Sequence, residues 1–318
     1  MDNSGSPESR AQVEARPRGS KLLIIDGHCY AYRAFFAIRS LTSPSGAATN
    51  AIYGFIRMLG KVVAQIHPTH LIVVWDGGLA KERMELHPTY KAHRPEMPSD
   101  LEAQLDEIVT YLRGANIYSY MKEGCEADDC IASITREAVE AGWEVVVATS
   151  DKDFMQLVSP AVRLVNPNDK TASLMGEAEV KAKTGVEPTQ IVDWLSLIGD
   201  AVDNIPGAPG IGPKTATDLL HQFGSIDNLY GRLGEVRSGR VRASLEQAGE
   251  AVRRNQKLVK LDAETSCGAP LEEMAMKPVN AEELRKLFGN WGFKKLLHEL
   301  EEAHAGTADF FAENVGVA

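Results

Sequence analysis

The chain has 318 residues, 44% of them hydrophobic and 25% charged, which is typical of a globular protein with one large or two modest domains. No apolar run is long enough to cross a membrane, and the four cysteines lack the CxxC spacing of a zinc site, so we expect a cytoplasmic protein. The net charge of −10 excludes a uniformly basic nucleic-acid binder, although locally segregated charge remains compatible with one.

Residues 1–20 are polar and rich in Ser, Pro, Gly and Arg, which predicts a disordered tail, and we expect a second tail at 305–318. Between them, three continuous apolar runs are typical of strands buried on both faces. The runs are 21–26 (KLLIID), 70–76 (HLIVVWD) and 144–149 (EVVVAT).

Helical patterns separate these runs, at 50–65, 100–112 and 126–140. Strands that alternate with helices predict right-handed crossovers and a parallel sheet, and therefore an α/β fold. From about residue 177 the pattern is mostly helical, ending with a helix at 282–303. We therefore expect an α/β core at 21–195 and a helical region at 196–304.

Acidic residues are concentrated at one edge of the expected sheet. Three predicted strands have an aspartate at or just past the carboxyl end, namely Asp26, Asp76 and Asp151, and the carboxyl ends of parallel strands open on the same edge. Helices start at this edge too, and Asp153 follows in the third strand's loop. An aspartate after a strand is often only a helix cap, and acids suit a helix's first turn, but neither explains the excess at one edge. The further acids expected there are Glu126, Asp128, Asp129, Asp200 and Asp203.

So many carboxylates in one place are costly, because two charges 4 Å apart repel by about 4 kcal/mol even at an effective dielectric of 20. Carboxylates without His or Cys suit Mg²⁺ or Mn²⁺ better than zinc. Two such ions about 3.5–4 Å apart are the arrangement that cleaves phosphodiesters. The acids therefore predict a metal site.

Residues 197–224 (LIGDAVDNIPGAPGIGPKTATDLLHQFG) combine an acidic pair with a Gly/Pro turn. Asp200 and Asp203 would share a face if this segment is helical. The turn precedes a helix that begins near Lys214, and a helix N-terminus with a lysine and Thr215 suits a phosphate. A Walker loop is excluded, because Pro213 precedes the lysine and no buried strand precedes the turn. A helix–loop–helix corner and a hairpin that grips nucleic-acid backbone both remain open.

Residues 81–94 are locally basic. On a helix, Tyr90, Lys91 and Arg94 would share a face and offer a stacking ring beside two cations. The alternative is a solvated surface loop.

Taken together, the motifs resemble the 5′-nuclease domain of bacterial DNA polymerase I and the flap endonucleases, from about residue 21 to 303. This resemblance implies a PIN-like, resolvase-like α/β fold with mostly parallel strands and a helical DNA-binding region. It also implies an arch at about 77–112 through which a 5′ flap passes. The matching segments are DGHCYAYRAFFA (26–37), WDGG (75–78), YKAHRPEMP (90–98), CEADDCIA (125–132), TSDKDFMQLV (149–158) and LIGDAVDNIPGAPGIGPKTA (197–216).

The resemblance also assigns roles to individual residues. Lys91, Arg94 and Arg33 would contact the substrate phosphates, and Tyr90 would pack on the terminal base. One metal would be surrounded by Asp26, Asp76, Glu126, Asp128 and Asp129, and a second by Asp151, Asp153, Asp200 and Asp203. Duplex contacts would come from Gly207, Gly210, Ile211, Gly212, Lys214 and Thr215, with a K⁺ ion at this hairpin, and from Arg83.

The function implied is that of a structure-selective 5′ nuclease, a 5′–3′ exonuclease and 5′-flap endonuclease with two or more Mg²⁺ or Mn²⁺ ions. We expect it to act as a monomer on DNA with a 5′ flap or 5′ end, including RNA primer–DNA hybrids, in replication and repair. Two alternatives remain. A non-catalytic DNA-junction binder would lack several of the acids, and an RNA-cleaving PIN-type enzyme would not need the Gly/Pro hairpin.

Overall fold

The computed structural model describes residues 19–169, 171, 173–305, 310 and 311. Of the disordered tail expected at 1–20, only Gly19 and Ser20 lie within this range, and Ser20 is buried, with its carbonyl oxygen accepting the N–H of Glu144. Most of the tail expected after residue 304 also lies outside the range. No helix within the described residues is long and apolar enough to span a membrane.

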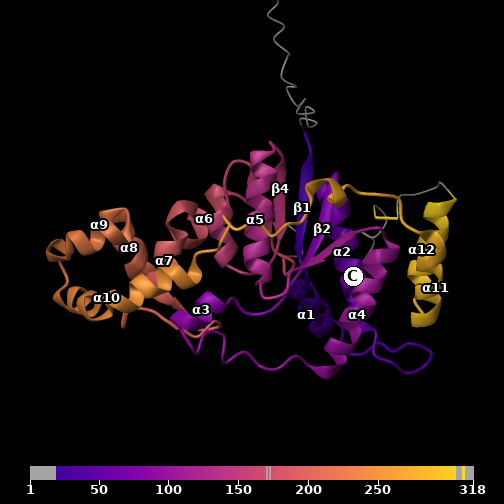
Figure 1. Cartoon of the computed structure of the whole chain (residues 1–318), viewed down its shortest axis with the longest axis horizontal. Helices are drawn as coiled ribbons and strands as arrows, with labels where there is room; N and C mark the ends of the chain where they lie inside the picture. Colours follow the sequence, from indigo (N-terminus) through magenta and orange to yellow (C-terminus); the bar gives the residue numbers. More distant parts are fainter. Residues whose placement is uncertain (1–18, 170, 172, 306–309, 312–318) are drawn as a thin grey trace, which may run out of the picture.

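A six-stranded sheet forms the centre of the fold, in the order β3-β2-β1-β4-β5-β6 (Figure 1). The first five strands are parallel, and β6 runs antiparallel to β5. The predicted parallel sheet and its three apolar strands are confirmed. The strands are β1 (Lys21–Asp26), β2 (His70–Trp75), β3 (Tyr118–Met121), β4 (Glu144–Ala148), β5 (Val162–Val165) and β6 (Leu174–Met175).

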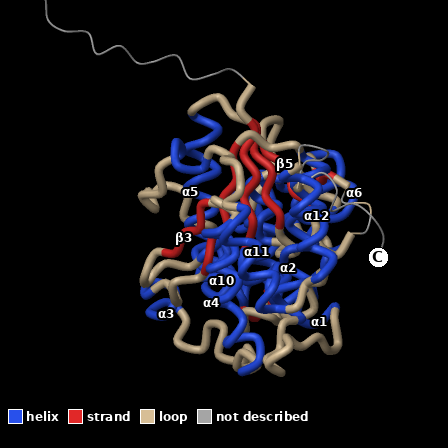
Figure 2. Tube along the Cα trace, turned by 90° about the vertical axis from the view of Figure 1, so that its right-hand side faces the viewer, coloured by secondary structure: helices blue, strands red, loops and turns tan. Residues whose placement is uncertain are grey.

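Helices cover both faces of the sheet, because successive residues of a strand point to opposite sides. Leu22 and Ile24 of β1 pack in the apolar cluster that contains α5, whereas Leu23 and Ile25 pack in the cluster of α1, α2 and α4. Figure 2 shows the sheet between α5 on one side and α2 and α12 on the other. These helices are α1 (Gly27–Ala37), α2 (Asn50–Ile66), α4 (Ser99–Gly114) and α5 (Ala127–Glu140).

Strand register aligns the carboxyl ends of the central strands. Asp26 of β1 is level with Val74 of β2, and Ile25 is level with Ala148 of β4. Because α1 begins directly after β1, and α5 begins at the same edge, the acidic residues predicted to meet there do start from neighbouring positions.

A group of helices continues from the α5 side of the sheet and is drawn in orange in Figure 1. One apolar cluster runs from Ile24 of the sheet through Trp194 of α7 to Leu245 of α10. The domain boundary expected after residue 195 therefore falls inside α7. The elements are α6 (Glu177–Thr184), η2 (Pro188–Gln190), α7 (Ile191–Ile198), β7 (Gly199–Asp200), β8 (Ile205–Pro206), α8 (Pro213–Phe223), α9 (Ile226–Gly231), η3 (Leu233–Glu235) and α10 (Gly239–Val259).

The last helices do not belong to that group, contrary to the expected helical region at 196–304. After η4 (Leu271–Met274), the chain returns to the opposite side of the sheet, where α11 (Ala281–Trp291) and α12 (Lys294–His304) pack in the cluster of α2 and α4. The single helix predicted at 282–303 is interrupted at Gly292, which has a φ of +75°. Phe310 and Phe311, in the expected tail, are buried in the same cluster.

Candidate metal centre and nucleic-acid interface

Asp26 combines a structural contact with a place in an acid-lined pocket. Its Oδ1 accepts the backbone N–H of Cys29 at 3.0 Å and so caps α1, while its Oδ2 accepts the Thr149 hydroxyl at 2.9 Å. Burial raises the pKa of Asp26 to about 6, and the negative charges of Asp151 and Asp76 add to that rise. The capping role predicted as an alternative is therefore real, but it accounts for only one oxygen.

Four acids from four segments line one pocket of about 620 Å³ with Asp200 and Asp203. Asp26 ends β1, Asp76 follows β2, Asp151 follows β4, and Asp128 lies in the first turn of α5. Burial raises the pKa of Asp128 well above its usual range, and the charge of Asp151 raises it further. The convergence of these acids at the sheet edge is as predicted.

Asp153, Asp200 and Asp203 form the second acidic group, called here the three-acid cluster. One carboxylate oxygen from each residue lies within 4.8 Å of the others, and all three residues are buried. Burial and the neighbouring negative charges raise the pKa of Asp153 well above its usual range. Among the described residues, the buried Asp153 Oδ1 has no hydrogen-bond partner. An orphaned carboxylate oxygen beside two other carboxylates fits a hard divalent cation.

The segment that holds Asp200 and Asp203 is not helical, so the condition under which they would share a helix face is not met. Asp200 ends β7, and Asp203 lies in the turn before β8. The turn nevertheless brings both carboxylates to the same place, within 4.8 Å of Asp153 at the start of η1 (Asp153–Leu157).

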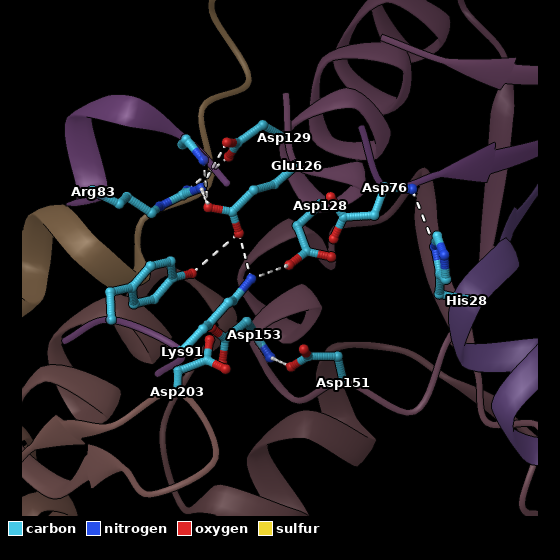
Figure 3. A network of polar contacts seen from close by, with 12 residues as sticks. His28, Asp76, Arg83, Lys91, Glu126, Asp128, Asp129, Asp151, Asp153 and Asp203 are labelled. Carbon is cyan, nitrogen blue, oxygen red and sulfur yellow. Dashed lines mark hydrogen bonds and ion pairs between the residues drawn. The ribbon is translucent and has the colours of Figure 1, made fainter. Parts of the chain in front are cut away.

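Glu126 and Asp129 do not line the pocket in this structure, although both were expected beside the first metal (Figure 3). Glu126 is completely buried and binds Lys91 and Arg83. Burial raises the pKa of Glu126, but these two cations outweigh burial, and the pKa lies below its usual value. Asp129 forms a bidentate pair with Arg83, with both contacts at 2.7 Å. In this structure both acids therefore form ion pairs with basic residues and do not face the pocket.

Arg83 is buried rather than available to DNA, contrary to its expected role. It lies on α3 (Lys81–Leu86) and, besides Asp129, donates to the backbone oxygens of Leu258 and Lys260. Arg83 therefore joins α3 to α5 and to the end of α10.

Residues 88–94 form turns, not the helix on which Tyr90 and Arg94 would share a face. Tyr90 is buried, and its hydroxyl donates to Glu126 Oε2 at 3.1 Å, so its ring is not free to stack on a base here. Lys91 has a φ of +55°, and its N–H donates to the Asp203 carbonyl oxygen. Its ammonium binds Glu126 and lies 3.8 Å from Asp128 (Figure 3).

Arg94 and Arg33 do lie at the pocket. Arg94 is exposed and donates to Asp203 Oδ1 at 2.6 Å. Arg33 is exposed on α1. Both guanidinium groups can reach a phosphate that enters the pocket from solvent.

Among the pocket residues that were not singled out from the sequence, His28 and Lys152 contact the acidic residues. His28 Nδ1 accepts the N–H of Asp76 at 3.2 Å, and burial lowers the pKa of His28. The Lys152 ammonium lies 3.3 Å from Asp200 Oδ2. Lys152 could have been noticed, because it lies between two of the acids, Asp151 and Asp153. His28 carries no such signal, because its contact depends on the alignment of β1 with β2.

The Gly/Pro hairpin at 207–215 joins β8 to α8 and is built around a backbone crossing. Gly199 has a φ of +76°, and a Cβ on Gly207 would lie 2.3 Å from the Ile198 carbonyl group, so both positions require glycine. Ile211 is buried. Of the residues expected to contact DNA, Gly207 therefore serves the backbone crossing and Ile211 packs its side chain inside the hairpin.

The remaining hairpin residues present a helix N-terminus to solvent. Gly210, with a φ of +74°, and Gly212, the cap of α8, are exposed, as is Lys214 in the first helical turn. Thr215 is half-buried. The first N–H groups of a helix have no partner within it, so with Lys214 they form a site for a backbone phosphate.

A parallel sheet with an acid-lined pocket at its carboxyl edge, and an exposed helix N-terminus on a Gly/Pro hairpin, are together the features expected of a metal-dependent nuclease. The comparisons agree with this class. The family described as "5'-3' exonuclease, N-terminal resolvase-like domain" matches residues 21–185, and "5'-3' exonuclease, C-terminal SAM fold" matches residues 186–282. The chain belongs to the 5′–3′ exonuclease family.

Curated relatives include both long and short proteins. The chain is 37% identical over 287 residues to DNA polymerase I of Bacillus caldotenax, an alignment that covers 88% of this chain but 32% of the polymerase. It is 36% identical over 282 residues to a 5′–3′ exonuclease of Aquifex aeolicus, covering 88% of this chain and 95% of that protein. The chain thus spans about a third of the polymerase and nearly the whole of the exonuclease.

Solved structures confirm the fold. A bacteriophage T5 flap endonuclease in complex with DNA and metal ions superposes with a TM-score of 0.64 at 20% identity, covering 89% of this chain and 99% of that one. The catalytic core of Rad2 in complex with DNA substrate gives 0.62 at 15% identity, covering 92% and 93%.

Proposed function

We propose that this protein is a structure-selective 5′ nuclease that hydrolyses DNA phosphodiesters at 5′ ends and 5′ flaps with Mg²⁺ or Mn²⁺. The observation that carries the proposal is the pair of acidic groups at the sheet edge, one of which contains the orphaned oxygen Asp153 Oδ1. Without a bound cation, several of these buried carboxylates are driven towards protonation, as the raised pKa values of Asp26, Asp128 and Asp153 indicate.

We assign the acids to two sets of ligands. Asp151, expected beside the second metal, is placed with the first set because it lies outside the three-acid cluster and its charge raises the pKa of Asp26 and Asp128. Asp26, Asp76, Asp128 and Asp151 line the pocket together and would hold one ion. The three-acid cluster would hold a second. Bound divalent ions supply the positive charge that activates water and stabilises the charge that develops on the phosphate.

The basic residues bind and orient the substrate. Arg33 and Arg94 line the pocket and would clamp the phosphate beside the acids. Lys91 would donate to the same phosphate once a cation replaces it beside Asp128. Tyr90 would act as a positioning residue, because its hydroxyl and the Lys91 ammonium share the same Glu126 oxygen.

The substrate is proposed to be DNA with a free 5′ end. The exposed N-terminus of α8 with Lys214 suits a duplex backbone, and a K⁺ ion at the hairpin is part of the same proposal. The similar flap endonuclease and Rad2 structures carry DNA. We further propose action as a cytoplasmic monomer in replication and repair, including the removal of RNA primers.

Cleavage of three labelled substrates tests the proposal: a 5′-flap DNA, a blunt DNA duplex and an RNA duplex, each with Mg²⁺ and with EDTA. We expect cleavage of the flap with Mg²⁺ only, weaker exonuclease action on the blunt duplex, and products that carry 5′-phosphates. Preferred cleavage of RNA would instead support the RNA-cleaving alternative. DNA binding without cleavage at any Mg²⁺ or Mn²⁺ concentration would support the non-catalytic junction binder.

A further inference from the structure

Lys152 occupies part of the three-acid cluster. It lies in the short connection between Asp151 and Asp153, and its ammonium is 3.3 Å from Asp200 Oδ2. The Lys152 side chain is 36% exposed, whereas the Asp200 side chain is 8% exposed. The lysine therefore reaches a buried carboxylate from the solvent-facing side and can leave it without being buried elsewhere.

The contact involves the Asp200 oxygen that is the less engaged within the protein's own backbone. Asp200 Oδ1 already accepts the backbone N–H of Val202 at 2.8 Å. Oδ2 is therefore the more available oxygen for a cation that binds the cluster through Asp200, and Lys152 holds it. Arg94 holds Asp203 Oδ1 in a similar way, at 2.6 Å.

The protein's own cations do not complete the cluster. Lys152 and Arg94 pair with two of the three carboxylates, and Asp153 Oδ1 is left without a partner among the described residues. Lys152 forms an ion pair with Asp200, one of the three acids, whereas a divalent ion can contact all three oxygens within the cluster's 4.8 Å span. A divalent ion should therefore bind Asp200 more strongly than Lys152 does, but it must displace the Lys152 ammonium to do so.

We propose that Lys152 is a tethered competitor of the divalent ion at the three-acid cluster. The lysine neutralises Asp200 in the metal-free protein and weakens the affinity of this cluster for metal. On the four-acid side the neighbouring lysine, Lys91, lies farther from its acid, 3.8 Å from Asp128, and already binds Glu126, so this side should bind its ion more tightly and first. This inference rests on the proposed metal centre.

Titration of the DNA-free protein with Mn²⁺, followed by calorimetry and by electron paramagnetic resonance, tests the proposal without any measurement of activity. The parent protein should show two sites of unequal affinity. Lys152→Met, which removes the charge but keeps the length, should tighten the weaker site by about tenfold and leave the tighter site within twofold, because the competing cation is gone. Lys152→Arg, which keeps a competing cation, should stay close to the parent.

A matched control separates local competition from general electrostatics. Lys181→Met removes an exposed lysine of α6 that pairs with Glu187 and does not line the pocket. This substitution should leave the Mn²⁺ affinity of both sites unchanged. Equal tightening of both sites by Lys152→Met would overturn the proposal, since it would reflect only a change in net charge. An unchanged weaker site would overturn it too.

The parent protein alone also tests the proposal, should the methionine variant fail to fold. Two sites of equal affinity in the parent would contradict it. Absence of any Mn²⁺ binding by the parent would overturn both the proposal and the metal centre on which it rests. Two unequal sites whose affinities do not change in Lys152→Met would overturn this proposal alone.

Discussion

The Lys91 ammonium forms an ion pair with Glu126 at a point where both side chains are almost wholly buried. Arg83 contacts the other oxygen of the same carboxylate at 3.2 Å, and the Tyr90 hydroxyl donates to Oε2. A single carboxylate thus ties the basic segment and α3 to the start of α5. Glu126, which the family resemblance assigned to a metal, therefore holds Lys91 and Tyr90, two residues proposed to act on the substrate.

Glu126→Gln should destabilise the metal-free protein by about 3 kcal/mol, because removal of one partner leaves the buried Lys91 without its counter-charge. Urea denaturation in EDTA measures the free energy of unfolding. Glu85→Gln is the control, since Glu85 pairs with Lys81 on the exposed face of α3 and should change stability by less than about 0.5 kcal/mol. Equal, small effects of the two substitutions would mean that Glu126 is not the anchor of this segment.

Asp151→Asn should abolish cleavage and leave the metal-free protein as stable as the parent or more so. Asp151 lies beside the charges of Asp203 and Asp200, and asparagine removes one repelling charge. The amide oxygen can still accept the N–H of Asp153, which Oδ1 accepts at 2.9 Å. Thermal melting in EDTA is the measurement. A marked fall in Tm would show that Asp151 is mainly a structural cap.

Asp26 should make the metal-free protein less stable as the pH rises. Its folded pKa of about 6 lies above the value of 3.8 for the free side chain, so folding favours the protonated carboxyl group. This contribution is fully present below pH 4 and is lost as the pH rises through 6, at a cost of about 3 kcal/mol at most.

Comparison with Asp26→Asn isolates this effect from other titrating groups. In EDTA, the unfolding free energy of the parent should fall relative to that of the variant between pH 4 and pH 7. A difference that stays constant over this range would show that the carboxyl group titrates normally.

The sequence predicted those parts of the fold that local patterns determine. The apolar strands β1, β2 and β4 were recognisable because they are buried on both faces. The edge strand β3 (YSYM) has mostly half-buried polar and aromatic residues, and β6 has two residues, so neither gives a strand pattern.

The sequence predicted which acidic residues gather at this edge of the sheet, but not which of their side chains face the pocket. Asp128 and Asp129 are neighbours on α5 and therefore point in different directions, and no local signal says which one faces the pocket. Asp129 meets Arg83, and Tyr90 meets Glu126, through contacts between segments distant in the chain. Such long-range pairs cannot be read from spacing.

Lys214→Ala should weaken binding to duplex DNA and reduce the salt dependence of binding by about one unit of slope, because one phosphate contact is lost. Metal affinity should not change, since Lys214 lies on α8 and not in the pocket lining. Fluorescence anisotropy in Ca²⁺ across a range of salt concentrations measures the slope. Lys286→Ala on α11, distant from the hairpin along the chain, is the control. Equal slopes for Lys214→Ala and the parent would contradict the proposed contact.

The central claim is that carboxylates from separate segments of the chain form a cation-binding centre at the carboxyl edge of the sheet. Anomalous diffraction from crystals soaked in Mn²⁺ tests it most directly. We expect two peaks, one among Asp26, Asp76, Asp128 and Asp151, and one among Asp153, Asp200 and Asp203. The claim would be contradicted by crystals soaked at saturating Mn²⁺ that show no anomalous peak at this edge and have these side chains directed to separate patches of solvent.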